Sequence, residues 1–472
     1  MPSNGSTQRR LMRTLAILGQ AKADWLALSI APSSFSQLFR AYILTSETLN
    51  DKNPYTLLDA STESWQIQAI AIISYTGLAM LLLVLSIFLL HLILGVFLPA
   101  PQPRRQQAVD DTPVDLFSLV QYTYLVPLAL LASVANFCGL VDITAMPLLA
   151  DVFLGIWRIC ACFGAMASIT ALPIYLMVKM RCSRLGMQQQ QQQQQQHKQA
   201  PWFLLYIPGI VAATTASELA AILPNKRASE VLFSGYLLWG SSVIPALAFA
   251  VVFVRARLSL TRQPNVYHLI LPLSLMSQTA LSIMALGIQS QRVWTDTGGP
   301  ATAPLLLGEM AMASGAILGM VFWAAAAAWF VSSHLAVVLK TTGPRSLLVA
   351  LRLLITTRIV AFPVASFAIA TAALARIWHS TMALALTKVL LAYVGCILSG
   401  IYVAMIWNVC SFAYGLVVSR KQRLALEPPG LYEQTDDSRP CLPQQQQQQR
   451  QRQQRQHAGD SAASGLQSYG SI

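Results

Sequence analysis

The sequence predicts an all-α membrane protein with about ten transmembrane helices, and three observations support this. Of its 472 residues, 55% are hydrophobic and only 11% are charged, whereas soluble domains average about 25% charged residues. The apolar residues gather in long runs, comparable to the roughly 20 residues that a helix needs to cross a bilayer. Short polar segments rich in Lys and Arg separate many of these runs.

Ten apolar runs are candidate spans. In chain order they cover about Trp25–Leu44, Ile67–Leu98, Leu116–Leu140, Leu154–Val178, Trp202–Asn225, Val231–Pro264, Asn265–Gly287, Gly308–Leu339, Ile359–Ile377 and Ala383–Tyr414. The first run is the weakest, because polar residues such as Gln37 and Arg40 interrupt it. A position in the membrane interface is therefore the alternative to a crossing for that run.

The formal net charge of +13 is best explained by anchoring to the cytoplasmic face, not by binding to nucleic acid. The loops and tails on one side of the predicted spans carry at least 18 Lys and Arg residues, and those on the other side carry five. Because positive charge stays in the cytoplasm, this asymmetry predicts that both termini are cytoplasmic. Two cytoplasmic termini require an even number of spans and favour including the first run.

Three regions are expected along the chain. Residues 1–22 form a basic cytoplasmic tail without a cleavable signal peptide, and residues 23–418 form the ten-helix transmembrane domain. A polyglutamine loop lies within 180–200, and residues 419–472 form a glutamine-rich cytoplasmic tail. Such low-complexity segments bury too little apolar area to fold, so both are expected to be disordered.

We expect no enzyme activity, cofactor, metal site or disulfide framework. Most of the seven cysteines lie inside apolar runs, where cysteine acts as a small hydrophobe. Cys160 and Cys162 lack the spacing of a zinc or redox motif. The sequence also lacks a P-loop, a zinc-protease motif and a dinucleotide-binding fingerprint in a suitable context.

Four motifs fall within residues 200–290. They are WFLLYIP from Trp202 to Pro208, SGYLLWG with Tyr236, Trp239 and Gly240, Arg257-Leu258 followed by Pro264, and Leu271-Pro272-Leu273 followed by Gln278 and Gly287. Together they resemble the tellurite-resistance/dicarboxylate transporter (TDT) family of the SLAC-like voltage-dependent anion channel superfamily. The fourth motif is most similar to the fungal sulfite efflux pumps, because the malate-permease branch tends to lack the glutamine.

The resemblance implies five helical hairpins around a central pore with quasi-five-fold symmetry. Odd-numbered helices would line this pore, even-numbered helices would face lipid, and the protein would be a homo-oligomer, with a trimer as one state. The pore would be narrowed by a phenylalanine of the ninth helix, which corresponds to Phe362, with Phe367 as the alternative. Where the family has glycines in the seventh helix, this chain has Ser274, Ser277 and Thr279, which implies a narrower, more hydroxyl-rich wall.

Prolines in odd-numbered spans are the first group of pore candidates. They are Pro127, Pro208, Pro272 and Pro363. A proline in mid-span kinks the helix and frees a carbonyl, which membranes tolerate beside a neighbour or a wet cavity. The alternative is an ordinary packing kink.

Neutral hydrogen-bond donors form the second group. Gln121, Ser217, Gln278 and Ser366 lie on odd-numbered spans. Such donors would bind an anion weakly enough for it to leave again. Hydrogen bonds between helices are the alternative role.

Two carboxylates fall within apolar runs. Glu309 begins its run and is expected at the interface, whereas Glu218 lies deeper. An ionised group in a membrane normally faces a cavity or a partner. For Glu218, three alternatives remain open: a proton-coupling carboxyl, a partner of a basic residue such as Arg158, and an interfacial position near Pro224.

The leading functional prediction is a plasma-membrane anion transporter that exports sulfite. A transporter of malate-like C4-dicarboxylates or other organic acids is the alternative within transport, and a multi-span receptor or membrane-embedded enzyme is the alternative outside it. The expected partners are a small inorganic or organic anion and the lipid bilayer.

Overall fold

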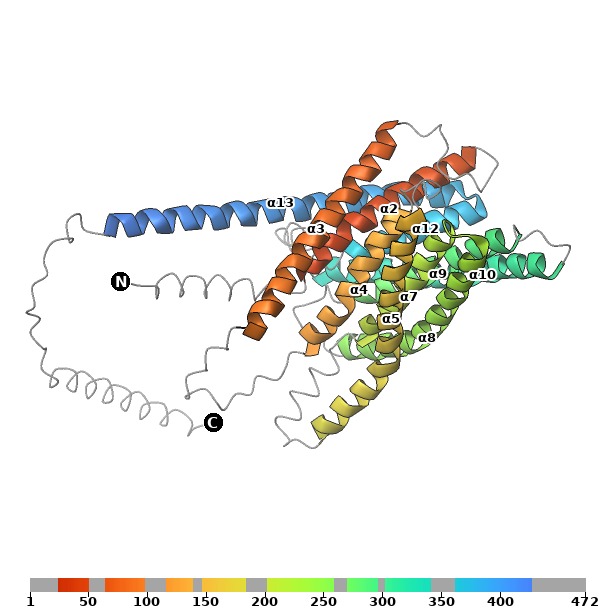
Figure 1. The fold of residues 1–472 in the computed structure, drawn as a ribbon, viewed down its shortest axis with the longest axis horizontal. Coiled ribbons are helices and arrows are strands. Elements are labelled where there is room, and N and C mark those ends of the chain that lie inside the picture. The colour runs from red at the N-terminus through yellow and green to blue at the C-terminus, as the bar shows by residue number, and fades with distance from the viewer. Residues whose placement is uncertain are drawn as a thin grey trace, which may run out of the picture. The chain divides into compact units, whose positions relative to one another are not determined.

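The structure is a computed structural model, which describes residues 24–50, 64–97, 116–138, 147–183, 202–258, 270–295, 302–340 and 361–426. This part of the chain forms ten α-helices and one short 3-10 helix, shown in Figure 1. They are α2 (Asp24–Asn50), α3 (Ser64–Phe97), α4 (Leu116–Cys138), α5 (Pro147–Ser183), η1 (Trp202–Tyr206), α7 (Ile207–Ala220), α8 (Asn225–Leu258), α9 (Leu271–Thr295), α10 (Thr302–Lys340), α12 (Ala361–Trp378) and α13 (Thr381–Leu426). Each of the ten predicted spans corresponds to one α-helix, with η1 opening the fifth.

The chain divides into two compact units. The first extends to Ile406, and the second begins at Trp407 and contains the end of α13. The helix α13 ends twelve residues beyond Tyr414, where the predicted tenth span stops. Both polyglutamine tracts and the N-terminal tail lie outside the described residues.

Five helices of the first unit form a closed inner ring. Going around it, α2 contacts α4, α4 contacts α7, α7 contacts α9, α9 contacts α12, and α12 returns to α2. These are the first, third, fifth, seventh and ninth helices of the predicted order. Four of them also contact the helix that follows them in the chain, and α12 shares a hydrophobic cluster with α13. The ring is thus built from five helical hairpins.

Burial alternates along the chain in the same way. In the most apolar window of each span, 89% of residues are buried in η1–α7, 83% in α9 and 72% in α12. The corresponding shares are only 22% in α5, 39% in α8, 22% in α10 and 33% in α13. Odd-numbered helices therefore pack against protein on most sides, whereas even-numbered helices present most of their surface outward.

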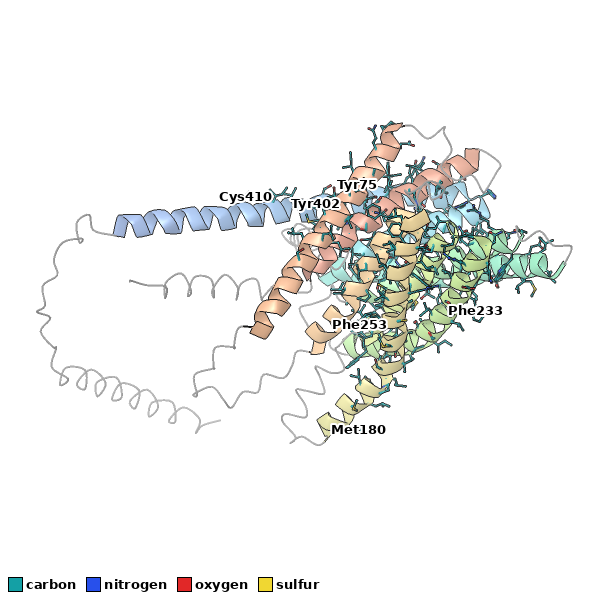
Figure 2. The ribbon with its side chains drawn as sticks, in the orientation of Figure 1. Tyr75, Met180, Phe233, Phe253, Tyr402 and Cys410 are labelled. Carbon is teal, nitrogen blue, oxygen red and sulfur yellow. The ribbon has the colours of Figure 1, made fainter. Side chains whose placement is uncertain are left out.

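The outward surface is apolar, as expected for contact with lipid. Phe233 of α8 and Met180 of α5, both labelled in Figure 2, are 64% and 56% exposed. In water, a surface with so many large apolar side chains would be an interaction or aggregation site. In a bilayer it is the surface that hydrocarbon chains cover.

The first helix, α2, lies in the inner ring. Its polar residues find partners in protein: Ser36 Oγ lies 2.8 Å from Ser74 Oγ of α3, and Gln37 Nε2 donates to the Ala132 carbonyl of α4 at 2.8 Å. Protein therefore surrounds this helix on most sides, which favours the crossing over the interfacial alternative. Its low hydropathy reflects contact with neighbouring helices on most sides instead of contact with lipid.

Glycine permits a close crossing of α5 and α7. A Cβ atom added to Gly164 would lie 2.9 Å from both the Cα and the backbone nitrogen of Gly209. Backbone atoms cannot move aside as a flexible side chain can. Close approach through small residues is a common way for membrane helices to associate.

We predict that Gly164→Ala lowers the thermal stability of the purified protein, because overpacking of this kind costs about 1–3 kcal/mol. Gly155→Ala, on the same helix, is the matched control, since its added Cβ would meet no atom within 4 Å. That control should be neutral or slightly stabilising, because alanine favours helix over glycine by about 0.5–1 kcal/mol. Equal melting temperatures of the two variants in detergent would contradict the predicted contact.

Candidate functional site

Buried polar groups concentrate on the inner ring. Of the 21 buried polar or charged residues in the described part of the chain, 17 lie on α2, α4, α7, α9 or α12. The remaining four are Ser74, Ser242, Ser333 and Thr387. Because the outer helices shield these groups from lipid, the interior of the ring is the candidate functional site.

Most hydroxyl groups of the inner ring donate to their own helix. Ser217 Oγ donates to the Thr214 carbonyl at 2.6 Å, Ser277 to Leu273 at 2.7 Å, and Ser282 to Gln278 at 2.7 Å. A hydroxyl has a single hydrogen to donate. Ser274 and Ser277 thus donate within α9, whereas Thr279 Oγ1 has no partner. Ser217 donates within α7, and its role towards an anion stays a prediction.

Gln278 and Ser366 connect α9 to α12. Gln278 is 5% exposed, and its Nε2 donates to Ser366 Oγ at 2.7 Å. Ser366 Oγ in turn donates to the backbone carbonyl of Phe362 at 2.8 Å. The structure thus shows the alternative role of these two residues, a hydrogen bond between helices. It also joins the glutamine of the fourth motif to the turn that carries Phe362.

Phe362 and Phe367 point in different directions. Five residues at 3.6 per turn separate their side chains by about 140° around α12. Phe367 is 2% exposed and stacks on Trp323 and Phe330 of α10, with ring centroids 6.1 Å and 5.3 Å apart. Phe362 is partly exposed and packs instead against the cluster formed mainly by α4, α5, α7 and α8. Of the two, Phe362 is the better candidate for a side chain in the ring interior.

Three of the four candidate prolines lie in the first turn of their α-helices. Pro208 and Pro272 are the second residues of α7 and α9, and Pro363 is the third residue of α12. A proline in the first turn breaks no helical hydrogen bond, because that N–H has no partner within the helix. Because η1 runs directly into α7, Pro208 lies where the 3-10 helix changes to an α-helix within the fifth span. Pro127 is the candidate that lies inside an α-helix, α4, and the kinks at the other positions stay a prediction.

Prolines inside helices also do not distinguish the inner helices from the outer ones. They occur in the inner helices α2 and α4, as Pro32 and Pro127, and in the outer helices α5 and α8, as Pro173 and Pro245. The presence of a proline within a span is therefore no guide to which helices line the interior.

An ion pair connects the first and fifth spans. Arg40 Nη2 donates to Glu218 Oε2 at 2.7 Å, with side chains 11% and 33% exposed. Glu218 does have a basic partner, but it is Arg40 and not Arg158, which is exposed on α5. Glu309 is exposed near the start of α10.

Sequence analysis did not identify Arg40 or Asn136 as site residues. Arg40 counted only as an interruption of a weak span, and Asn136 of α4 is 2% exposed. An arginine and a buried amide in apolar runs are the signals that could have identified them, because polar groups in a membrane require partners. No group of three His, Cys, Asp or Glu within the described residues is placed to hold a metal ion.

The remaining motif residues support contacts between helices. Trp202 and Leu271 are each 4% exposed, Tyr236 OH lies 3.2 Å from Ser290 Oγ, and Trp239 Nε1 donates to the Thr279 carbonyl at 3.3 Å. A Cβ on Gly287 would lie 2.8 Å from the Ala311 carbonyl oxygen, whereas one on Gly240 would meet nothing within 4 Å. Pro264 and the side chains of Gln121, Arg257 and Leu258 lie outside the described part of the structure.

This architecture defines a class. Seven helices among the described residues are long and apolar enough to cross a membrane, and apolar outer helices surround a ring that contains most of the buried polar groups. The chain is a multi-pass α-helical membrane protein.

Its residues 24–413 match the sequence model of the SLAC1 family, described as voltage-dependent anion channel, and the chain belongs to that family. No curated protein matches the chain. Family membership supports anion transport as the general function.

We predict that Phe367→Ala lowers stability without increasing anion flux. Removing a buried, stacked phenylalanine costs about 3–5 kcal/mol, and the ring faces α10 instead of the interior. Melting temperature in detergent and flux per folded molecule in liposomes measure the two effects separately. A gain in flux would transfer the gating role from Phe362 to Phe367.

Proposed function

We propose that this protein exports small anions, sulfite in particular, through a passage enclosed by α2, α4, α7, α9 and α12. The observation that carries the proposal is the closed inner ring, whose interior side chains are shielded from lipid by apolar outer helices. Membership of an anion channel family supports the charge of the substrate. The side chain of Phe362 acts as the plug that occludes this passage.

Gln278 is the residue that supports sulfite as the substrate. In the fourth motif this glutamine resembles the sulfite-pump branch, and in the structure its amide reaches Ser366, whose hydroxyl binds the Phe362 carbonyl. The residue that distinguishes the branch is thus connected to the proposed plug. A malate-like C4-dicarboxylate or another organic acid is the second candidate, since the wider TDT family that the motifs resemble includes malate permeases.

The driving force for export is the membrane potential. An inside-negative potential contributes about 2.3 kcal/mol per charge for each 100 mV, which moves anions outward without nucleotide hydrolysis. The proposal places the protein in the plasma membrane with both termini in the cytoplasm, as the asymmetry of Lys and Arg favours. A homotrimer is the proposed assembly, by resemblance to the family.

A receptor or a membrane-embedded enzyme is the alternative outside transport. Such a protein would not conduct anions after purification and reconstitution into liposomes. The export tests below therefore distinguish these classes as well as the substrates.

We predict that Phe362→Ala increases anion flux, because removal of the ring opens the passage at α12. Phe233→Ala is the control, since Phe233 is 64% exposed on the outer helix α8 and should leave flux unchanged. Flux is measured in liposomes and divided by the amount of folded, inserted protein. Unchanged or reduced flux in a correctly inserted Phe362→Ala protein would contradict the plug.

We also predict that the protein restores sulfite tolerance to cells that lack their own sulfite pump, while malate release changes little. Growth in sulfite and malate in the medium are compared with cells carrying an empty vector. Malate release without sulfite tolerance would favour the dicarboxylate alternative. A change in neither would refute both substrates.

A further inference from the structure

Two buried nitrogen donors in the inner ring lack a hydrogen-bond partner. Within the described residues, the buried side-chain nitrogens without one are Arg40 Nη1 on α2 and Asn136 Nδ2 on α4. The other buried atoms in this state are oxygens, including Gln278 Oε1 and Thr279 Oγ1. A buried donor left unpaired costs about 1–3 kcal/mol, and more when it is charged. Two such donors in one region therefore need an explanation.

The register of α2 and α4 brings these donors to the same level. Gln37 of α2 bonds to the Ala132 carbonyl of α4. On α2, Arg40 lies one turn after Gln37 and on the same face. On α4, Asn136 lies one turn after Ala132 and on the same face. Parallel helices in this register place Asn136 at the level of Arg40, whose Nη2 pairs with Glu218.

We propose that Arg40 and Asn136 form a binding site for a small oxyanion, with Glu218 as an internal competitor. The inference rests on the proposed function and deepens it by naming residues that bind the anion inside the ring. A guanidinium group and an amide offer N–H donors suited to oxygen acceptors. Several ring hydroxyls, including those of Ser217, Ser277 and Ser282, already donate to backbone carbonyls.

Glu218 explains how such a site can release its anion. Its carboxylate occupies one edge of the Arg40 guanidinium and leaves Nη1 free. The Glu218 side chain is 33% exposed, against 11% for Arg40, so the acid has more room to move than the base. Partial neutralisation of Arg40 keeps anion binding weak, which conduction requires because a bound ion must also leave.

Binding of sodium sulfite to the purified full-length protein in detergent tests this site. A ligand that binds only the folded state raises the melting temperature as its concentration increases. The expected result is a saturable rise whose midpoint increases about tenfold or more in Arg40→Gln, the effect of losing a charge-assisted hydrogen bond. Asn136→Leu, similar in size but without donors, should raise the midpoint by about threefold to tenfold.

Arg227→Gln is the matched control. Arg227 and Asp151 form an ion pair of nearly the same length, 2.8 Å, but their side chains are 55% and 63% exposed. The sulfite midpoint of this variant should equal that of the unaltered protein. If Arg40→Gln does not fold, the double variant Arg40→Gln/Glu218→Gln removes both charges and should show the same loss of sulfite binding.

Glu218→Gln tests the role of the competitor. Without sulfite this variant should melt at a lower temperature, because Arg40 loses its partner. With sulfite it should regain stability at a lower concentration than the unaltered protein needs, and it can be purified in sulfite if necessary. A midpoint that stays the same or rises would contradict competition.

The inference is overturned if sulfite does not stabilise the unaltered protein, or if Arg40→Gln and Asn136→Leu retain its midpoint. A purely structural ion pair would give that second result, with stability lost in the single variants and regained in the double variant. Sulfite flux in liposomes then separates this inference from the proposed function. If sulfite flux does not depend on Arg40, the proposed function stands and the binding site is contradicted. If sulfite binds but no flux occurs, the binding site stands and the proposed function is contradicted.

Discussion

The closure of the inner ring is the constraint on which the rest of this structure depends. Hydrocarbon offers no hydrogen bonds, so each polar group within a membrane must be satisfied by protein or by an enclosed aqueous space. Seventeen buried polar or charged residues of the described chain lie on five helices that contact one another in a circle. Closure of this circle keeps those polar residues in contact with protein on most sides. Only four buried polar residues of the described chain lie on the outer helices, whose exposed surfaces are mostly apolar.

Much of this fold could be predicted from the sequence, because hydropathy reports directly on contact with lipid. Each predicted span overlaps one α-helix, and the division into inner and outer helices followed from the family motifs. The weak first span shows where hydropathy fails. Residues such as Gln37 and Arg40 make α2 look unsuited to a membrane, yet α2 touches little lipid, so its composition follows its protein neighbours.

The site was less predictable, because directions around a helix and partners between helices are not local properties. Phe362 and Phe367 are equivalent by composition, and only packing places Phe367 against α10. Glu218 required a cation, but nothing near it in sequence indicates Arg40, which is 178 residues away. For Pro208, hydropathy could not show that the fifth span opens as a 3-10 helix and becomes an α-helix at Ile207.

The long separation between Arg40 and Glu218 has a consequence for how the protein is made. At about 5–20 residues per second, a ribosome needs roughly 10–35 s to synthesise the chain between them. During this interval α2 carries a cation whose acid does not yet exist, and a charge at the centre of a lone helix resists insertion by about 2.5–3.5 kcal/mol. The first helix thus depends on the insertion machinery, or on its early neighbours, until the fifth span arrives. The earliest helix would thus gain its counter-ion only when the fifth span has been made, and its last ring neighbour, α12, later still.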